Sequence, residues 1–307
     1  MNMVSVVIPC YNQARFLGEA IESVLAQTVS GSEIVVVDDG STDNTIDIAS
    51  RYRDVRCVSQ RNQGQGAARN EGLKHTSGEF VVFLDADDRL LRHAFEVGLR
   101  CFEAHPQVAF VAGRCVGLGV DGVQRKVRYD PVVERNHYVR LLLGNFIWMP
   151  GTVMFRTAVV RGVGGFKTTV SGAEDYDLYL RIARHHQIWC HDQVIAEYRQ
   201  HETSTSRKPM LMMRSSLNVM WAQREAVRGD PPAKLALRQG IRNWQQMYGE
   251  QLVNAVRKQL RAREWKRAIP SLIGLLHYHP AGFIQHACRK ISRVARGHRP
   301  ESPDAIG

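Results

Sequence analysis

The chain has no uninterrupted apolar stretch of the roughly 18 residues that a membrane-spanning helix needs. Its opening residues, MNMVSVVIPCYN, lack the basic segment followed by an apolar segment that marks a secretory signal. The six cysteines are scattered, without a Cys-x-x-Cys pair or a metal-type pairing with histidine. These absences argue against a spanning protein, a secreted protein and a zinc protein. We expect reduced thiols in a cytoplasmic protein.

Acidic residues are scarce in one part of the chain only. Residues 251–300 contain 11 lysines and arginines against a single acid, Glu264, and so carry +10 of the total formal charge of +11. The other residues together are close to neutral. With 44% hydrophobic and 23% charged residues, and no repeat or low-complexity tract, the composition is typical of a folded globular protein.

Short β-branched runs alternate with helical patterns over the first hundred residues. The expected strands cover 4–8, 33–39, 55–60 and 79–85, and the expected helices cover 14–28, 41–54 and 66–76. We expect Ser41 or Thr42 to cap the second helix. Alternation of this kind, with continuous apolar strands, favours a mainly parallel sheet covered by helices on both faces.

The alternation loosens after residue 88 and strand signals stop near residue 207. Further helices are expected over 89–106 and 174–186, and further strands over 108–119, 152–155 and 188–201, the last as one strand or a pair of short ones. The rest of the chain is predicted to form helices over 211–227, 233–265 and 283–297, with a break at Asp230-Pro231-Pro232. We predict a catalytic domain over 1–207 and a basic helical extension over 208–307.

Carboxylates follow two of the expected buried strands. Asp38 and Asp39 end the second strand, and the fourth ends in Asp85, Asp87 and Asp88. Ligands of open α/β sheets bind outside the carboxyl ends of the strands, so we expect these acids to meet in one cleft. Mg²⁺ or Mn²⁺ would relieve their repulsion and take phosphate oxygens as further ligands. The alternative is a polar turn with solvated aspartates and a cap for a helix that begins at Arg89.

Ordered motifs in the chain resemble those of family 2 glycosyltransferases. They are VSVVIPCYNQ (4–13), SVLAQT (23–28), EIVVVDDGSTDNT (33–45), NQGQGAARNEGL (62–73) and GEFVVFLDADD (78–88), followed by GGF (164–166), AEDYDLYLRIA (173–183) and YRQHETSTS (198–206). The resemblance covers about residues 3–206. It implies the GT-A nucleotide-diphospho-sugar transferase fold, a Rossmann-like mixed and mainly parallel sheet, here with a C-terminal helical extension.

The resemblance also implies a donor site. Pro9, Tyr11 and Asp39 would hold the nucleotide base, Arg69 would face the ribose or diphosphate, and Asp85 would contact the ribose directly or through water. Taken alone, Tyr11 could be a core aromatic and Arg69 a surface residue.

A metal is implied beside the donor. Asp87 would coordinate Mg²⁺ or Mn²⁺, and Asp88 would be a second ligand or a helix cap. Asp38 would orient the following loop. His201 matches a family position near the diphosphate and metal, with Arg199 beside it.

The reaction that the resemblance implies is direct displacement with inversion at the anomeric carbon. Asp175 matches the family's general base, which takes the acceptor proton, and Glu174 is expected to position the acceptor or Asp175. Both acids begin an expected helix, whose N-terminus should keep Asp175 ionised. The alternative is that they only neutralise the helix dipole. Trp148 and Met149 would flank the acceptor cleft or pack in the core.

The sequence thus indicates an inverting transferase that moves a sugar, expected to be UDP-linked, to a glycan or lipid-linked hydroxyl in bacterial surface polysaccharide synthesis. A non-catalytic nucleotide-sugar-binding scaffold at the membrane surface is the alternative. The basic residues 251–300 suit peripheral contact with anionic lipid on the inner face of the cytoplasmic membrane, or else form a solvated appendage or an oligomer contact. No nucleic-acid motif accompanies them, so nucleic-acid binding is disfavoured.

Overall fold

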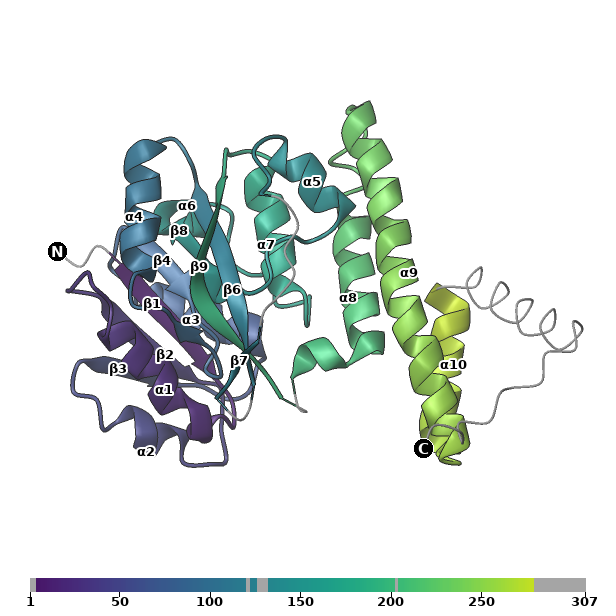
Figure 1. Ribbon diagram of the computed structural model, residues 1–307, viewed down its shortest axis with the longest axis horizontal. Coiled ribbons are helices and arrows are strands. Elements are labelled where there is room, and N and C mark those ends of the chain that lie inside the picture. Colours follow the sequence, from purple (N-terminus) through teal and green to yellow (C-terminus); the bar gives the residue numbers. More distant parts are fainter. Residues whose placement is uncertain (1–3, 120–121, 126–131, 202–203, 279–307) are drawn as a thin grey trace, which may run out of the picture.

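A mixed sheet forms the centre of the α/β part of the molecule in the computed structural model, which describes residues 4–119, 122–125, 132–201 and 204–278 (Figure 1). Nine strands of the described residues belong to it, in the order β3-β2-β1-β4-β8-β6-β9-β5, with β7 beside β6. The strands are β1 (Val4–Cys10), β2 (Glu33–Asp38), β3 (Val55–Ser59), β4 (Phe80–Phe83), β5 (Arg89–Leu90), β6 (Phe110–Gly119), β7 (Gln124–Arg125), β8 (Val153–Arg156) and β9 (Trp189–Gln200).

The strands β1 to β4 run parallel to one another. In their register Cys10 lies opposite Asp38, and Val7 lies opposite Phe83. The residues that follow β1, β2 and β4 therefore emerge at the same edge of the sheet. The rest is mixed, because β8 pairs antiparallel with β4 and β6, while β9 is parallel to β6.

Two cores cover the two faces of the sheet, as the continuous apolar strands require. In β1, Val4, Val6 and Ile8 face one core, and Val7 faces the other. The first core is closed by α1 (Ala14–Leu25), α2 (Thr45–Ala49) and α4 (Ala94–Ala104). The second is closed by α3 (Gln65–Lys74), α5 (His137–Leu143), α6 (Thr157–Gly162) and α7 (Glu174–Ala183).

Three further helices stand beside the sheet on the side of α5 and α7 (Figure 1). They are α8 (Pro209–Ala222), α9 (Pro231–Arg261) and α10 (Trp265–Tyr278), and short 3₁₀ turns lie at Pro150–Thr152 and Thr205–Arg207. The predicted break before α9 is present, and the Asp230 carboxylate caps this helix by accepting a hydrogen bond from Ala233 N at 3.0 Å. No helix of the described residues is long and apolar enough to cross a membrane.

Two expectations for local structure are wrong. The helix expected over 41–54 is limited to Thr45–Ala49, because Ser41 is part of a turn in which its hydroxyl accepts a hydrogen bond from Asn12 N at 2.9 Å. The helix expected over 89–106 begins only at Ala94, because β5 pairs with β9 and Arg89 Nε lies 2.6 Å from Glu197 Oε2. In both places long-range contacts override the local pattern. The helix expected over 283–297 lies outside the described residues.

The helix α9 packs closely against α5 at Gly240. A methyl group there would overlap the carbonyl oxygen of Leu142 and lie 2.7 Å from Met220 Cε. We expect Gly240→Ala to lower the free energy of unfolding by about 1–3 kcal/mol, although alanine is the better helix former. Gly162→Ala is the matched control, because nothing lies within 4 Å of a methyl group at that helical position. Equal urea midpoints for the two variants would contradict this packing of the extension.

Candidate active site

A cleft of about 630 Å³ opens at the carboxyl ends of β1, β2 and β4. Seven of the predicted site residues line it: Pro9, Tyr11, Asp39, Asp85, Asp87, Asp88 and His201. The other four, Arg69, Glu174, Asp175 and Arg199, are not among its lining residues. Among the lining residues that were not predicted are Tyr198, the first residue of the YRQHETSTS motif, and Lys208, which lies two positions after it.

The end of the cleft next to β1 and β2 combines an exposed ring with a buried acid. Tyr11 is half-exposed, while Asp39 is buried and accepts hydrogen bonds from Gln60 Nε2 at 2.6 Å, Gln63 N at 2.9 Å and Gly64 N at 2.8 Å. Gly64 has φ of 89°, a conformation that glycine adopts without strain. Asp39 thus holds the 60–64 loop, and its Oδ2 retains capacity for one more donor.

Arg69 is buried between Asp85, which lines the cleft, and the acids of α7. Its Nη2 lies 2.7 Å from Asp85 Oδ1, which also accepts a hydrogen bond from Gln65 Nε2 at 2.8 Å. Burial alone would lower the pKa of Arg69, but the charges of Asp85, Glu174 and Asp175 outweigh it and raise that pKa. The alternative of a surface arginine is therefore wrong, because the side chain is 2% exposed.

Asp87 and Asp88 have different surroundings although they are adjacent. Asp87 Oδ2 lies 2.7 Å from His201 Nε2. Burial and the charge of Asp85 raise the pKa of Asp87, and the hydrogen bond with His201 opposes this shift. The Asp88 carboxyl is buried, and burial followed by the charges of Asp87 and Asp85 raises its pKa well above the ordinary value.

The role of Asp88 as a helix cap is wrong. No helix begins at Arg89, and Asp88 Oδ1 instead accepts a hydrogen bond from Arg199 N of β9 at 2.8 Å. Its Oδ2 has no hydrogen-bond partner within the described part of the chain. Asp88 therefore ties the acidic turn to the neighbouring strand.

The buried Arg199 links this turn to α1. Its Nε donates to the carbonyl of Asp87 at 2.9 Å, and its Nη2 lies 2.7 Å from Glu19 Oε2. The guanidinium also stands 4.5 Å from the centre of the Phe16 ring. Glu19 was not predicted, since only the fold brings a residue 180 positions away into contact with Arg199.

The first turn of α7 carries Glu174 and Asp175. Glu174 is buried and accepts a hydrogen bond from Gly172 N at 2.8 Å, while Asp175 Oδ1 accepts one from Tyr176 N at 2.8 Å. Burial raises the pKa of Asp175 to about 6, with Arg69 opposing the shift and Glu174 adding to it. Desolvation is the larger effect on this pKa, but a value of about 6 still leaves Asp175 ionised at neutral pH, as expected for an acid at a helix start.

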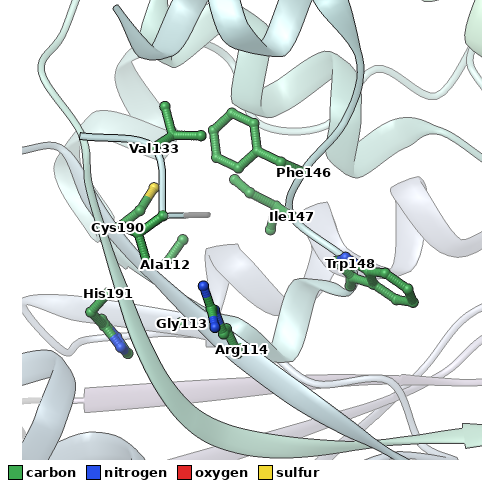
Figure 2. A pocket seen from close by; sticks show the side chains of 10 residues that line it. Ala112, Gly113, Arg114, Val133, Phe146, Ile147, Trp148, Cys190 and His191 are labelled. Carbon is green, nitrogen blue, oxygen red and sulfur yellow. The ribbon is translucent and has the colours of Figure 1, made fainter. Parts of the chain in front are cut away.

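A second, smaller pocket of about 50 Å³ lies between β6, β9 and the 146–148 segment. Figure 2 shows Phe146 and Ile147 close to Val133, whereas the Trp148 ring points away from it. Trp148 is half-exposed, but Met149 is buried next to Gly151 and Leu84. Of the two predictions for these residues, core packing is therefore right for Met149.

The cleft contains two side chains that could bind a metal ion, Asp87 and His201. In the described ranges no group of three or more His, Cys, Asp or Glu side chains could hold a metal ion. Asp87 and His201, however, stand side by side on the cleft wall. Mg²⁺ in phosphate-binding sites commonly takes one or two carboxylates and completes its shell with substrate phosphates and water. The residues present fit such an ion, provided that a diphosphate supplies the remaining ligands.

A mainly parallel sheet with acids and an aromatic residue along one cleft at its carboxyl edge defines the GT-A class of nucleotide-sugar transferases. The family model described as "Glycosyl transferase family 2" matches residues 5–163, more than half of the chain. The chain belongs to this family.

Curated relatives match parts of the chain. An uncharacterised glycosyltransferase of Nostoc sp. is 47% identical over 105 residues, 33% of each chain. Chondroitin synthase of Escherichia coli is 29% identical over 218 residues, 68% of this chain and 30% of that one. An uncharacterised glycosyltransferase of Rickettsia typhi is 28% identical over 210 residues, 66% of each chain. The chain thus spans only about a third of the first two relatives.

Solved structures confirm the predicted fold. TarS of S. aureus, residues 1–349 in complex with UDP-GlcNAc, superposes with a TM-score of 0.65 at 21% identity and covers 91% of this chain and 81% of that one. A mannosyltransferase from Pyrobaculum calidifontis, in complex with GDP-Man and Mn²⁺, gives 0.59 at 20% identity, with coverage of 91% and 87%. Coverage of 91% means that both alignments extend into the helical extension.

Proposed function

We propose that the protein transfers a sugar from a nucleotide sugar, with a UDP-sugar as the expected donor, to a hydroxyl of a glycan or lipid-linked acceptor. The observation that carries this proposal is the cleft of about 630 Å³ in which Tyr11 and Asp39 face the Asp85–Asp88 turn. An aromatic ring and a carboxylate with a free acceptor site suit a nucleotide base. A cluster of acids suits a ribose and a metal-bound diphosphate. The UDP-GlcNAc complex of TarS supports the donor class.

Asp87 and His201, which are in contact on the cleft wall, are the proposed protein ligands of Mg²⁺ or Mn²⁺. The Mn²⁺ complex of the Pyrobaculum enzyme supports the use of a divalent metal. When bound, the ion would offset the charge that develops on the leaving diphosphate. Arg199 is proposed to keep the Asp87 backbone in place, through its hydrogen bond to the carbonyl. The segment from Ser204 to Lys208, which lines the cleft, is proposed to cover the donor and exclude water.

Asp175 is proposed to act as the general base of an inverting displacement. The acceptor oxygen attacks the anomeric carbon, its proton passes to the Asp175 carboxylate, and the nucleoside diphosphate leaves from the opposite face. A pKa of about 6 keeps this carboxylate ionised at neutral pH while leaving it basic enough to accept a proton. Arg69 is proposed to maintain the ionised state, since its charge lowers the pKa of Asp175.

The acceptor is proposed to approach past Trp148. This ring is half-exposed, and the segment that follows packs on Leu84, directly before the acidic turn. An exposed indole can stack on a sugar face. The relationship to chondroitin synthase supports a glycan acceptor and a role in bacterial surface polysaccharide synthesis. For a lipid-linked acceptor, peripheral contact of residues 251–300 with the inner face of the cytoplasmic membrane is part of the same proposal.

A donor screen tests the proposal. Melting temperatures and donor hydrolysis are measured with UDP-, GDP- and dTDP-sugars, with and without Mn²⁺. One donor is expected to stabilise the protein only with metal, by about 2.7 kcal/mol at a concentration of 100 times Kd. No shift with any nucleotide sugar would reject the proposed function. Binding without hydrolysis or transfer would favour a non-catalytic scaffold.

A further inference from the structure

The helix α10 exposes one continuous apolar stripe. Trp265 is 58% exposed, Ile269 55%, Ile273 62% and Leu276 44%. At 3.6 residues per turn these four side chains fall within about 80° of one another around the helix axis. Single exposed apolar residues are ordinary on protein surfaces, but four on one face of a 14-residue helix form a patch that calls for a partner.

The opposite face of α10 is packed, so the outward direction of the stripe is fixed. Ala268, Gly274 and Leu275 are buried, and a methyl group at Gly274 would overlap the side chain of Met210 on α8. Leu275 belongs to the small core that α8, α9 and α10 share. The stripe therefore cannot turn inward without breaking this core.

Positive charge is concentrated at the end of α9 and the start of α10, next to the Trp265 end of the stripe. In the described part of the region after residue 251, one acid, Glu264, stands among six exposed cations: Arg257, Lys258, Arg261, Arg263, Lys266 and Arg267. Glu264 is paired with Arg267, with Nη1 to Oε2 at 3.3 Å. On the helical wheel Lys266 follows the edge of the stripe directly. A partner for this face must accept apolar side chains and carry negative charge beside them.

We propose that this face of α10 lies in the interface of an anionic membrane, parallel to its plane. Ile269, Ile273 and Leu276 would enter the acyl boundary, and Trp265, at the start of the helix, would lie at the level of the head groups. The cations at the end of α9 and the start of α10 would contact lipid phosphates. A helix of 14 residues is too short to span a bilayer, so it binds from one side.

This inference assigns the proposed membrane contact to one helix face and rests on that part of the proposed function alone. Vesicle binding tests it without donor or acceptor. Failure of vesicle binding would leave the donor screen and the transferase proposal untouched.

The experiment uses the full chain and co-sedimentation with vesicles of phosphatidylcholine alone or mixed with phosphatidylglycerol. We expect binding to the anionic vesicles to exceed binding to the neutral ones by at least about tenfold at low salt, and to fall as salt is added. Vesicles should also shift the tryptophan emission to the blue, and Trp265→Phe should lose most of this shift. Absence of wild-type binding to anionic vesicles would overturn the proposal.

The decisive variant is Ile269→Asp combined with Ile273→Asp, which should reduce vesicle binding by at least about tenfold. The matched control is Ile46→Asp combined with Leu235→Asp. It removes two exposed apolar side chains and adds the same charge away from α10. Equal binding of the two double variants would overturn the proposal. The proposal would also be overturned if the wild type bound no vesicles and formed a dimer that the stripe variant converted to a monomer. That result would assign this face of α10 to contact with a second copy of the chain.

Discussion

Replacing Asp175 with asparagine is expected to lower the rate of sugar transfer by about 10²–10⁴-fold, the usual contribution of a general base. Asparagine keeps the acceptor for Tyr176 N but cannot take the proton of the acceptor hydroxyl. Donor binding should change little, because Asp175 is not among the residues that line the cleft proposed for the donor. In the wild type the transfer rate should fall about tenfold per pH unit below pH 6, as Asp175 becomes protonated.

The same variant should be at least as stable as the wild type at neutral pH. Burial raises the pKa of Asp175 to about 6, whereas an unfolded aspartate titrates near about 3.9. The stability linked to this group is therefore fully present below about pH 4 and is lost as the pH rises through about 6. Asparagine carries no such loss. Melting temperatures of the two proteins between pH 4 and pH 8 should diverge in favour of the variant.

Asp177→Asn is the matched control on the same helix. The Asp177 carboxylate is buried and lies 2.6 Å from Arg181 Nε and 3.2 Å from Lys167 Nζ, so its removal should lower the melting temperature. Transfer by the folded fraction should persist. If Asp175→Asn keeps transfer near the wild-type rate, the assignment of the base is wrong. If it melts as early as Asp177→Asn, the raised pKa of Asp175 is wrong.

The sequence was sufficient to predict the edge of the sheet at which the cleft opens. The first strands are recognised from short apolar runs and were predicted to be parallel. The residues that follow them must therefore emerge at the same edge of the sheet. Tyr11, Asp39 and Asp85 do line one cleft there. The sequence did not reveal that Asp39 is also engaged by three donors from its own chain.

The features that sequence could not supply are those in which distant segments meet. The sequence predicts a helix that begins at Arg89, but in the structure this residue pairs with β9. Nothing in the sequence distinguishes Glu19 from other residues of α1, whereas in the structure it forms an ion pair with Arg199. The pKa of Asp175 follows the same rule. The sequence predicts that Asp175 lies at the start of a helix. The burial that raises its pKa depends on how α7 packs in the fold.

Replacing Asp87 with alanine is expected to remove the metal-dependent part of donor binding and to lower transfer by at least about 100-fold. This side chain is the one acid of the turn that stands beside His201 on the cleft wall. Titration of Mn²⁺ against the UDP-sugar complex, followed by the melting temperature, measures the effect. Asp54→Ala is the charge-matched control, since Asp54 is exposed and lies elsewhere.

Asp88→Asn separates the two neighbouring acids. Asparagine keeps an oxygen for Arg199 N, which is the hydrogen bond that Asp88 makes in the structure, so we expect less than about a tenfold loss of transfer. A loss as deep as that of Asp87→Ala would make Asp88 a second metal ligand and contradict the structural role argued for it. If neither variant alters the Mn²⁺ titration, the acids after β4 do not hold a metal, and their clustering must be explained by the donor and by Arg199 alone.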